Sequence, residues 1–234
     1  MTAADGTPAM FRGFFINLDR ARDRLQHVTT ELERVGLSQH YTRVRGIPNV
    51  RGTVGCFHSH LHCLDMARRQ DEIVHVIEDD ALFTPEARDF LLSGEPARLL
   101  RLYDMVYLDM WVDPKPATIA QYQQALAHPG PMDLRGVRVG CVSSYLVTPD
   151  SARKLLRLLR RKEPPVDNLI NGLVQGGEVR AAVMVPFLTG IDIEFGSRSQ
   201  IQKHIDSAEQ RRYVMMRTSF FVDKQRQAHW QLAG

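Results

Sequence analysis

Three consecutive carboxylates, Glu78, Asp79 and Asp80, follow the largely apolar run Ile73–Ile77. Hard oxygen ligands suit Mg²⁺ or Mn²⁺, which proteins usually bind through one or two carboxylates together with the phosphates of a substrate. The triplet therefore predicts a divalent-cation site that serves a phosphorylated ligand. The alternative is structural: a turn rich in acids, or acids that cap a helix beginning near Thr84.

Arginines follow the first predicted strand and could bind an anion. Arg20 and Arg24 are one helical turn apart, so they share a face of the helix predicted there. A helix N-terminus favours negative charge, and arginine recognises phosphate through two parallel hydrogen bonds. These residues indicate a phosphate site, although solvent-exposed arginines are common at helix starts.

A third cluster gathers cysteines and histidines in the segment 55–63, and it raises a zinc hypothesis. Its members are Cys56, His58, His60, His62 and Cys63. The spacing does not match a common zinc motif, but in a helix Cys56, His60 and Cys63 approach one face while the other two histidines point elsewhere. The favoured interpretation is that Ser59 or His58 caps the helix and His60 faces an active-site cleft.

The elements that must position these residues alternate between strand and helix. Apolar runs predict strands over residues 11–18, 41–44, 73–77, 105–108, 139–147 and 179–185. Periodicity and caps predict helices over residues 19–35, 59–69, 151–162 and 168–173, with Gly-rich and Pro-rich residues 46–55 as a loop. Residues 111–135 are polar and indicate an excursion or lid. The alternation is typical of an α/β fold, in which ligands bind at the carboxyl ends of the strands.

Composition narrows the class of protein. The chain has 234 residues, 44% of them hydrophobic and 24% charged, which is ordinary for one large globular domain. A net charge of +3 without a basic motif argues against a nucleic-acid binder. Three cysteines indicate reduced thiols, and neither a secretory signal nor a run of about 20 apolar residues is evident. We therefore expect a cytoplasmic protein.

One predicted helix is strongly basic, with Arg153, Lys154, Arg157, Arg160, Arg161 and Lys162 placed around its leucines. Such a helix could rest on an anionic membrane as a peripheral contact at the inner face. The favoured alternative is a helix that packs on the sheet through its leucines and exposes its basic face to water.

Several segments, taken in order, resemble glycosyltransferase family 25, which includes bacterial lipooligosaccharide galactosyltransferases and the collagen galactosyltransferases. The most specific are Gly55-Cys56 with Ser59-His60, and Ile77-Glu78-Asp79-Asp80. The supporting segments are Ile16–Arg20 with Arg24, Tyr107-Leu108, Ser144–Val147 with Ala152 and Leu155-Leu156, Pro165–Asp167, Val185-Pro186 and Ser199–Ile201. Asp109 and Thr189-Gly190 depart from the family pattern. The resemblance spans residues 14–201.

The resemblance implies a GT-A-like α/β domain over residues 11–205, with a Rossmann-like nucleotide-binding half and a mixed central sheet flanked by helices. Residues 1–10 are then a flexible start and residues 206–234 an extension that packs on the domain. The implied activity is a metal-dependent, inverting transfer of a hexose, commonly galactose, from a UDP-sugar to a glycan or glycolipid acceptor such as lipooligosaccharide. A nucleotide-sugar-binding module without turnover and a metal-dependent phosphohydrolase are the alternatives.

The resemblance also implies roles for individual residues. Mn²⁺ or Mg²⁺ would be held by Asp80 with Glu78 and His204. The nucleotide and its phosphates would contact Asn17, Arg20 and Arg24, with Glu78 and Asp79 reaching the metal, the ribose or the sugar. Ser59 and His60 would orient the donor sugar. Asp167 is the candidate general base, and Asp109 is the alternative.

Overall fold

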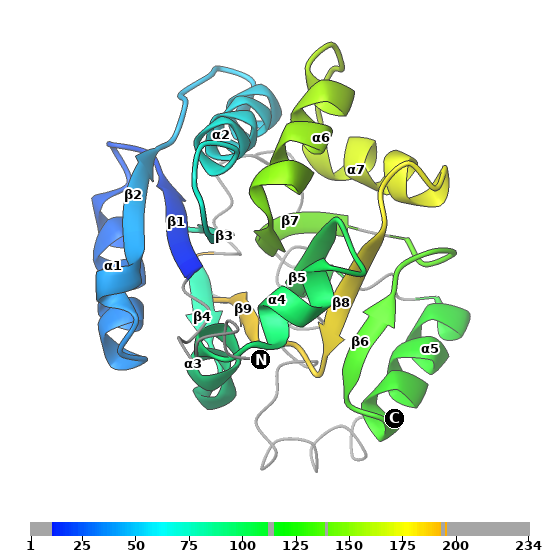
Figure 1. The fold of residues 1–234 in the computed structure, drawn as a ribbon. Coiled ribbons are helices and arrows are strands. Elements are labelled where there is room, and N and C mark those ends of the chain that lie inside the picture. Colours follow the sequence, from blue (N-terminus) through cyan, green and yellow to red (C-terminus); the bar gives the residue numbers. More distant parts are fainter. Residues whose placement is uncertain (1–10, 112–114, 139, 193–194, 196–234) are drawn as a thin grey trace.

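A seven-stranded mixed sheet forms the centre of the computed structural model, which describes residues 11–111, 115–138, 140–192 and 195 (Figure 1). The strand order is β2-β1-β3-β7-β5-β8-β6. The strands are β1 (Phe11–Asn17), β2 (Tyr41–Arg45), β3 (Ile73–Glu78), β5 (Met105–Trp111), β6 (Gly130–Asp133), β7 (Gly140–Val147) and β8 (Ala181–Val185). A separate antiparallel pair joins β4 (Ala81–Phe83) to β9 (Thr189–Ile191).

Strand directions decide which ends meet. β1 is parallel to both β2 and β3, β7 is antiparallel to β3 and β5, and β8 is parallel to β5. The carboxyl ends of β1, β2, β3, β5 and β8 therefore lie along one edge of the sheet. The mixed α/β fold that the sequence predicted is confirmed.

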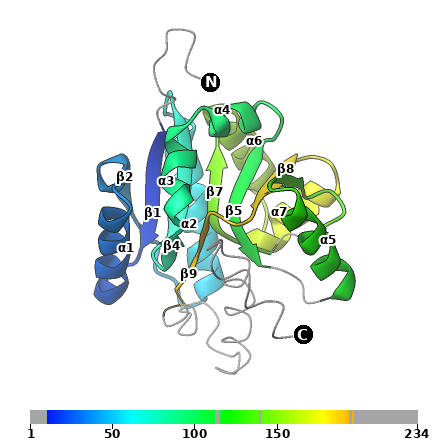
Figure 2. The same ribbon diagram turned by 90° about the horizontal axis from the view of Figure 1, so that it is seen from below.

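Helices cover both faces of the sheet (Figures 1 and 2). They are α1 (Arg22–Arg34), α2 (Gly52–Ala67), α3 (Pro85–Leu92), α4 (Glu95–Leu100), α5 (Pro116–Ala127), α6 (Pro149–Leu159) and α7 (Val166–Gln175), with a short 3₁₀ turn at Ser38–His40. One buried cluster joins the sheet to α2, α5, α6 and α7, and a second joins the other face to α1, α3 and α4. Successive residues of β3, Val76 and Ile77, enter opposite clusters. Burial on both faces explains the continuous apolar run there.

The basic helix α6 follows its sequence closely. The Thr148 hydroxyl accepts a hydrogen bond from the Ser151 backbone, so it caps the helix as expected. Leu155 and Leu159 are fully buried, while Arg157 is exposed. The predicted packing of the leucines on the core is therefore confirmed, and the contact of the basic face with a membrane stays a prediction.

Two segments differ from the prediction. Helix α2 begins at Gly52, so the loop after β2 is shorter than residues 46–55. The expected excursion or lid over residues 111–135 is wrong for its described part, because α5 and β6 belong to the packed fold. Tyr122 of α5 is fully buried against Phe187, and β6 pairs with β8. The burial of one aromatic residue against the core is enough to pack this segment onto the fold, although most of its residues are polar.

Some predictions concern residues outside the described ranges. They are the flexible start at 1–10, the C-terminal extension at 206–234, the segment Ser199–Ile201 and the ligand His204. Among the residues that are described, no helix combines the length and the apolar character needed to cross a membrane.

Candidate functional site

A pocket lies at the sheet edge where the carboxyl ends of β1 and β3 meet. The connection through α1 leads from β1 to β2 on one side, and the connection through α2 leads to β3 on the other, so these strands form a topological switch point. Its walls come from β1 and the turn that leads into α1, the first turn of α1, the loop after β2, the first turns of α2, and the end of β3 with the two acids that follow it. The lining residues are Ile16, Leu18, Arg20, Arg24, Gly46, Ile47, Asn49, Gly52, Gly55, Cys56, Ser59, His60, Glu78, Asp79 and Asp80.

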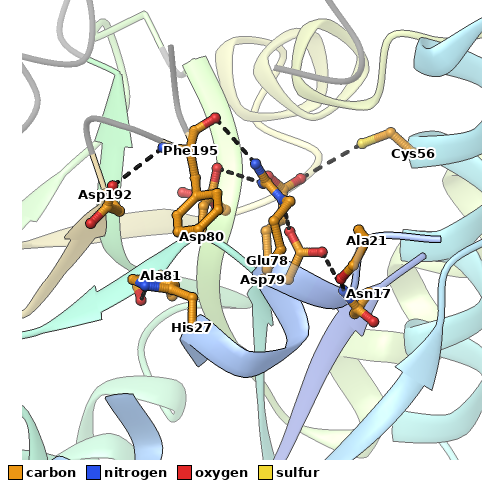
Figure 3. Close-up of polar contacts among 12 residues, drawn as sticks. Asn17, Ala21, His27, Cys56, Glu78, Asp79, Asp80, Ala81, Asp192 and Phe195 are labelled. Carbon is orange, nitrogen blue, oxygen red and sulfur yellow. Dashed lines mark hydrogen bonds and ion pairs between the residues drawn. The ribbon is translucent and has the colours of Figure 1, made fainter. Parts of the chain in front are cut away.

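Arg24 holds the acidic triplet together. Its Nε donates to Oδ1 of Asp79 at 2.6 Å, and its Nη2 lies 2.9 Å from Oδ2 of Asp80. The guanidinium also donates to the carbonyl of Phe195 and lies over the ring of that residue (Figure 3). One buried cation therefore fixes two of the three consecutive carboxylates.

The electrostatics of this cluster are tightly coupled. Burial on its own lowers the pKa of Arg24. The charges of Asp80 and Asp79, with their hydrogen bonds, raise it by more than burial lowers it, so the net pKa lies above its usual value. Burial raises the pKa of Asp79 to about 6, although Arg24 and Asn17 act in the opposite direction. The guanidinium stabilises negative charge at a place where burial alone would disfavour it.

Asn17, at the end of β1, holds the Asp79 carboxylate in place through a hydrogen bond. Its side-chain amide donates to Oδ2 of Asp79 at 2.7 Å and to the carbonyl of Ala21 at 3.0 Å, and it is 1% exposed. Arg43 in turn donates to Oδ1 of Asn17 at 3.0 Å. The structure therefore places Asn17 as a support for Asp79, and it does not line the pocket. Its predicted contact with nucleotide stays a prediction.

Asp80 is the carboxylate best suited to a hard cation. Within the described part of the chain, its Oδ1 atom is buried and has no hydrogen-bond partner, while Oδ2 faces Arg24. A buried carboxylate oxygen without a partner is costly, and a bound cation would relieve that cost. The residues therefore fit a divalent cation at this position, with Glu78 two residues away on the same pocket wall.

Helix α2 contributes a second group of polar side chains. His60 is 1% exposed, and its two ring nitrogens lie 3.2 Å from the Tyr145 hydroxyl and 3.4 Å from Oε1 of Glu78. The Cys56 thiol lies 3.8 Å from the same oxygen. His60 therefore faces the pocket wall, as the sequence predicted, and it meets Glu78 there.

The Ser59 hydroxyl joins helix α2 to the loop after β2. Its hydroxyl donates to the Gly55 carbonyl at 2.7 Å and accepts from the Ile47 backbone at 2.8 Å. A Cβ at Gly55 would lie 2.5 Å from the Ile47 carbonyl oxygen, so only glycine permits this close approach. The loop and the first turn of α2 are thus held together beside the pocket. A contact between Ser59 and a donor sugar remains a prediction.

The two candidate bases lie in different surroundings. Asp109 of β5 is fully buried, and its Oδ2 accepts a hydrogen bond from Ser143 at 2.9 Å. Asp167 is partly exposed in the first turn of α7, where Oδ1 accepts from the Asn168 backbone. Burial is the main cause that raises the pKa of the Cys56 thiol, and the charge of Asp167 is a smaller contribution after those of Glu78 and Cys141.

Sequence reasoning missed the residues that support this site. Arg43, Tyr145 and Phe195 each contact a predicted site residue, but they come from β2, β7 and a position near the end of the described chain. Nothing in the local sequence marks Arg43 or Phe195, and Tyr145 was visible only as part of the family-like segment Ser144–Val147. Gly55 was visible as half of the Gly-Cys pair, and its role follows only from the loop that packs against it.

Comparisons with known proteins identify one family. The model of glycosyltransferase family 25, described as an LPS biosynthesis protein, matches residues 48–170. No protein of curated function matches the sequence. A putative glucose-1-phosphate thymidylyltransferase from Bacillus anthracis, solved with sucrose, is 10% identical with a TM-score of 0.44 over 86% of this chain and 99% of that one. An inositol-1-phosphate CTP transferase from T. maritima is 10% identical, with a TM-score of 0.41 over 76% and 86%.

Proposed function

The chain belongs to glycosyltransferase family 25, and we propose that it transfers a hexose, galactose in the first instance, from a UDP-sugar to a glycan such as lipooligosaccharide. The observation that carries this proposal is the pocket at the ends of β1 and β3. It combines the cationic side chain of Arg20 with the carboxylates of Glu78 and Asp80. A sugar nucleotide offers the matching groups, because its diphosphate is anionic and binds divalent cations.

In this proposal the carboxylates bind a cation, and the two arginines have different roles. Asp80 and Glu78 would hold Mn²⁺ or Mg²⁺, and the bound cation would supply positive charge that neutralises the diphosphate of the departing UDP. Arg20 contacts the diphosphate. Arg24 is a positioning residue, because its guanidinium is bound to Asp79 and Asp80.

Inverting transfer needs a base that removes the acceptor hydroxyl proton on the face of the sugar opposite the leaving group. We assign this role to Asp167, which is partly exposed, in preference to the fully buried Asp109. An Asp167→Asn variant should lose transfer while it still binds UDP. If transfer survives in that variant and fails in Asp109→Asn, the assignment is wrong. The anomeric configuration of the product, read by NMR, tests inversion.

The first experiment measures UDP release from a panel of UDP-sugars, with and without Mn²⁺, in the presence of a glycan acceptor. We expect release with one sugar, dependent on metal, and at least about 100-fold lower in Asp80→Asn, because the loss of a metal ligand costs more than the loss of a supporting contact. Asp71→Asn is the matched control, because Asp71 is exposed, precedes the opposite end of β3 from the triplet and does not line the pocket.

The alternatives are distinguished by two further measurements, of UDP binding and of phosphate release. A binding module would bind UDP in calorimetry and release none from any sugar. A phosphohydrolase would release phosphate from a simple phosphate monoester without an acceptor. Either result would refute the proposed transfer.

A glycolipid acceptor would lie at a membrane, and the basic face of α6 offers a peripheral contact at the inner leaflet. Arg157, Arg160 and Arg161 are exposed beside a surface hollow that also includes Arg68. We expect the protein to float with anionic vesicles and to lose this binding when the three exposed arginines are replaced by glutamine. Removing the same charge elsewhere, at the exposed residues Arg12, Arg22 and Arg88, should have a smaller effect.

A further inference from the structure

Three side chains of metal-ligating type meet at the pocket wall formed by α2 and β3. Cys56 and His60 lie one turn apart on α2, and Glu78 ends β3. One ligand atom from each, a sulfur, a nitrogen and an oxygen, lies within 4.8 Å of the other two. Figure 3 shows the Cys56 thiol directed at the Glu78 carboxylate.

Two of the three separations between these atoms are close to those around a tetrahedral zinc ion. Zinc lies about 2.3 Å from sulfur and about 2.0–2.2 Å from nitrogen and oxygen, so tetrahedral angles place sulfur and oxygen about 3.6 Å apart and nitrogen and oxygen about 3.4 Å apart. The observed separations are 3.8 Å for Cys56 Sγ to Glu78 Oε1 and 3.4 Å for His60 Nε2 to the same oxygen. The sulfur and the nitrogen lie within 4.8 Å of each other, against about 3.6 Å in a tetrahedral site, so side-chain movements of up to about an ångström would complete the geometry.

The surroundings of His60 favour coordination. Its Nδ1 atom lies 3.2 Å from the Tyr145 hydroxyl, which fixes the ring with Nε2 toward Glu78 and Cys56. Metal-bound histidines usually have such a partner on the second ring nitrogen. The helix holds both α2 ligands on one face, so the same rigid element positions two of the three ligand atoms.

The charge and the access also fit. A thiolate, a carboxylate and a neutral imidazole sum to two negative charges, which a divalent cation balances. All three residues line the pocket, so a fourth coordination position would open toward it. Protein sites with three ligands and an open fourth position are typical of zinc that contacts a substrate or water.

We propose that Cys56, His60 and Glu78 bind a thiophilic divalent cation, Zn²⁺ in the first instance, whose fourth position faces the pocket. As the metal binds, Sγ of Cys56 becomes a thiolate ligand and its proton passes to solvent. This site shares Glu78 with the hard-cation position proposed at Asp80, but it differs from that position in chemistry, because sulfur and imidazole select Zn²⁺ over Mg²⁺. The inference goes beyond the proposed transfer and does not depend on it.

The test uses the full, reduced protein without nucleotide. Co²⁺ is titrated as a spectroscopic substitute for Zn²⁺, and Zn²⁺ affinity is then measured by competition. We expect a thiolate-to-cobalt charge-transfer band, displaced by Zn²⁺, together with the release of a proton. The band should disappear in Cys56→Ser, and Zn²⁺ affinity should fall by at least about 100-fold in Cys56→Ser and in Glu78→Gln.

His62→Ala is the matched control, because His62 is an exposed histidine on the same helix that is not in the cluster. Circular dichroism checks that each variant folds. If Cys56→Ser does not fold, Glu78→Gln still tests the proposal. Absence of the band, or equal loss of Zn²⁺ affinity in His62→Ala, would overturn the proposal and leave a hydrogen-bonded Cys–Glu–His cluster. Because no sugar nucleotide is used, neither result of this experiment bears on the proposed sugar transfer, which is tested separately by UDP release.

Discussion

Replacing Arg24 by methionine should destabilise the protein through the two carboxylates that it leaves behind. Arg24, Asp79 and Asp80 are 8%, 7% and 6% exposed, so their pairing is buried. With an effective dielectric constant near 20, each ion pair at about 4 Å between charge centres contributes roughly 4 kcal/mol before desolvation. Removing one partner of a buried pair typically costs about 3–5 kcal/mol, and we expect that loss in the free energy of unfolding at pH 8.

The loss should depend on pH in a defined direction. Burial raises the pKa of Asp79 to about 6 in the folded protein, above its ordinary value of 3.8. Ionisation of this carboxyl therefore costs stability as the pH rises, and the cost grows when Arg24 no longer lowers the pKa. Each further unit of pKa is worth about 1.4 kcal/mol. The difference in the free energy of unfolding between the variant and wild type should consequently be smaller at pH 5 than at pH 8.

Urea unfolding followed by circular dichroism measures these differences. Adding Asp79→Asn to the Arg24→Met variant should recover about 0.5–3 kcal/mol, because it removes one of the stranded charges. Arg22→Met is the matched control on the same helix, since Arg22 is exposed, and it should change stability by less than about 0.5 kcal/mol. A loss below about 1 kcal/mol in Arg24→Met at pH 8, or no recovery in the double variant, would refute the reasoning.

Other predictions follow from single contacts. Burial lowers the pKa of His75 to about 3 from an ordinary 6.5, so the unfolded chain binds a proton first as the pH falls below 6.5. From this cause wild type should lose about 2 kcal/mol of stability between pH 7 and pH 5, and His75→Gln should lack that slope in denaturant titrations. Gly55→Ala should cost about 1–3 kcal/mol because its Cβ would meet backbone at 2.5 Å, whereas Gly172→Ala in open space on α7 should be neutral or stabilising; thermal melts compare them. Thr148→Ala should lower stability by about 1 kcal/mol through the lost helix cap, and Thr148→Ser should restore most of it.

Local sequence signals were enough for most of the elements. The apolar run of β3 and the Thr148-Pro149 start of α6 were readable because their periodicity and caps agree with their tertiary environment. The segment containing α5 was misread, since its single buried tyrosine acts only through contact with a residue far along the chain. The start of α2 was misplaced because Gly52 and Gly55 disfavour helix locally, and the tight packing of the loop after β2 requires a glycine there.

The sequence by itself determined the family and the types of group in the site: consecutive carboxylates after a buried strand, arginines after the first strand, and a Cys-His pair at helical spacing. These signals lie within short segments, where periodicity and residue type suffice. Only the tertiary structure decided how the groups are paired. It bound Arg24 to Asp79 and Asp80, left one oxygen of Asp80 without a partner among the described residues, and brought Glu78 to Cys56 and His60. Such pairings join residues from different elements, and their distances depend on how α1, α2 and β3 meet at one edge of the sheet.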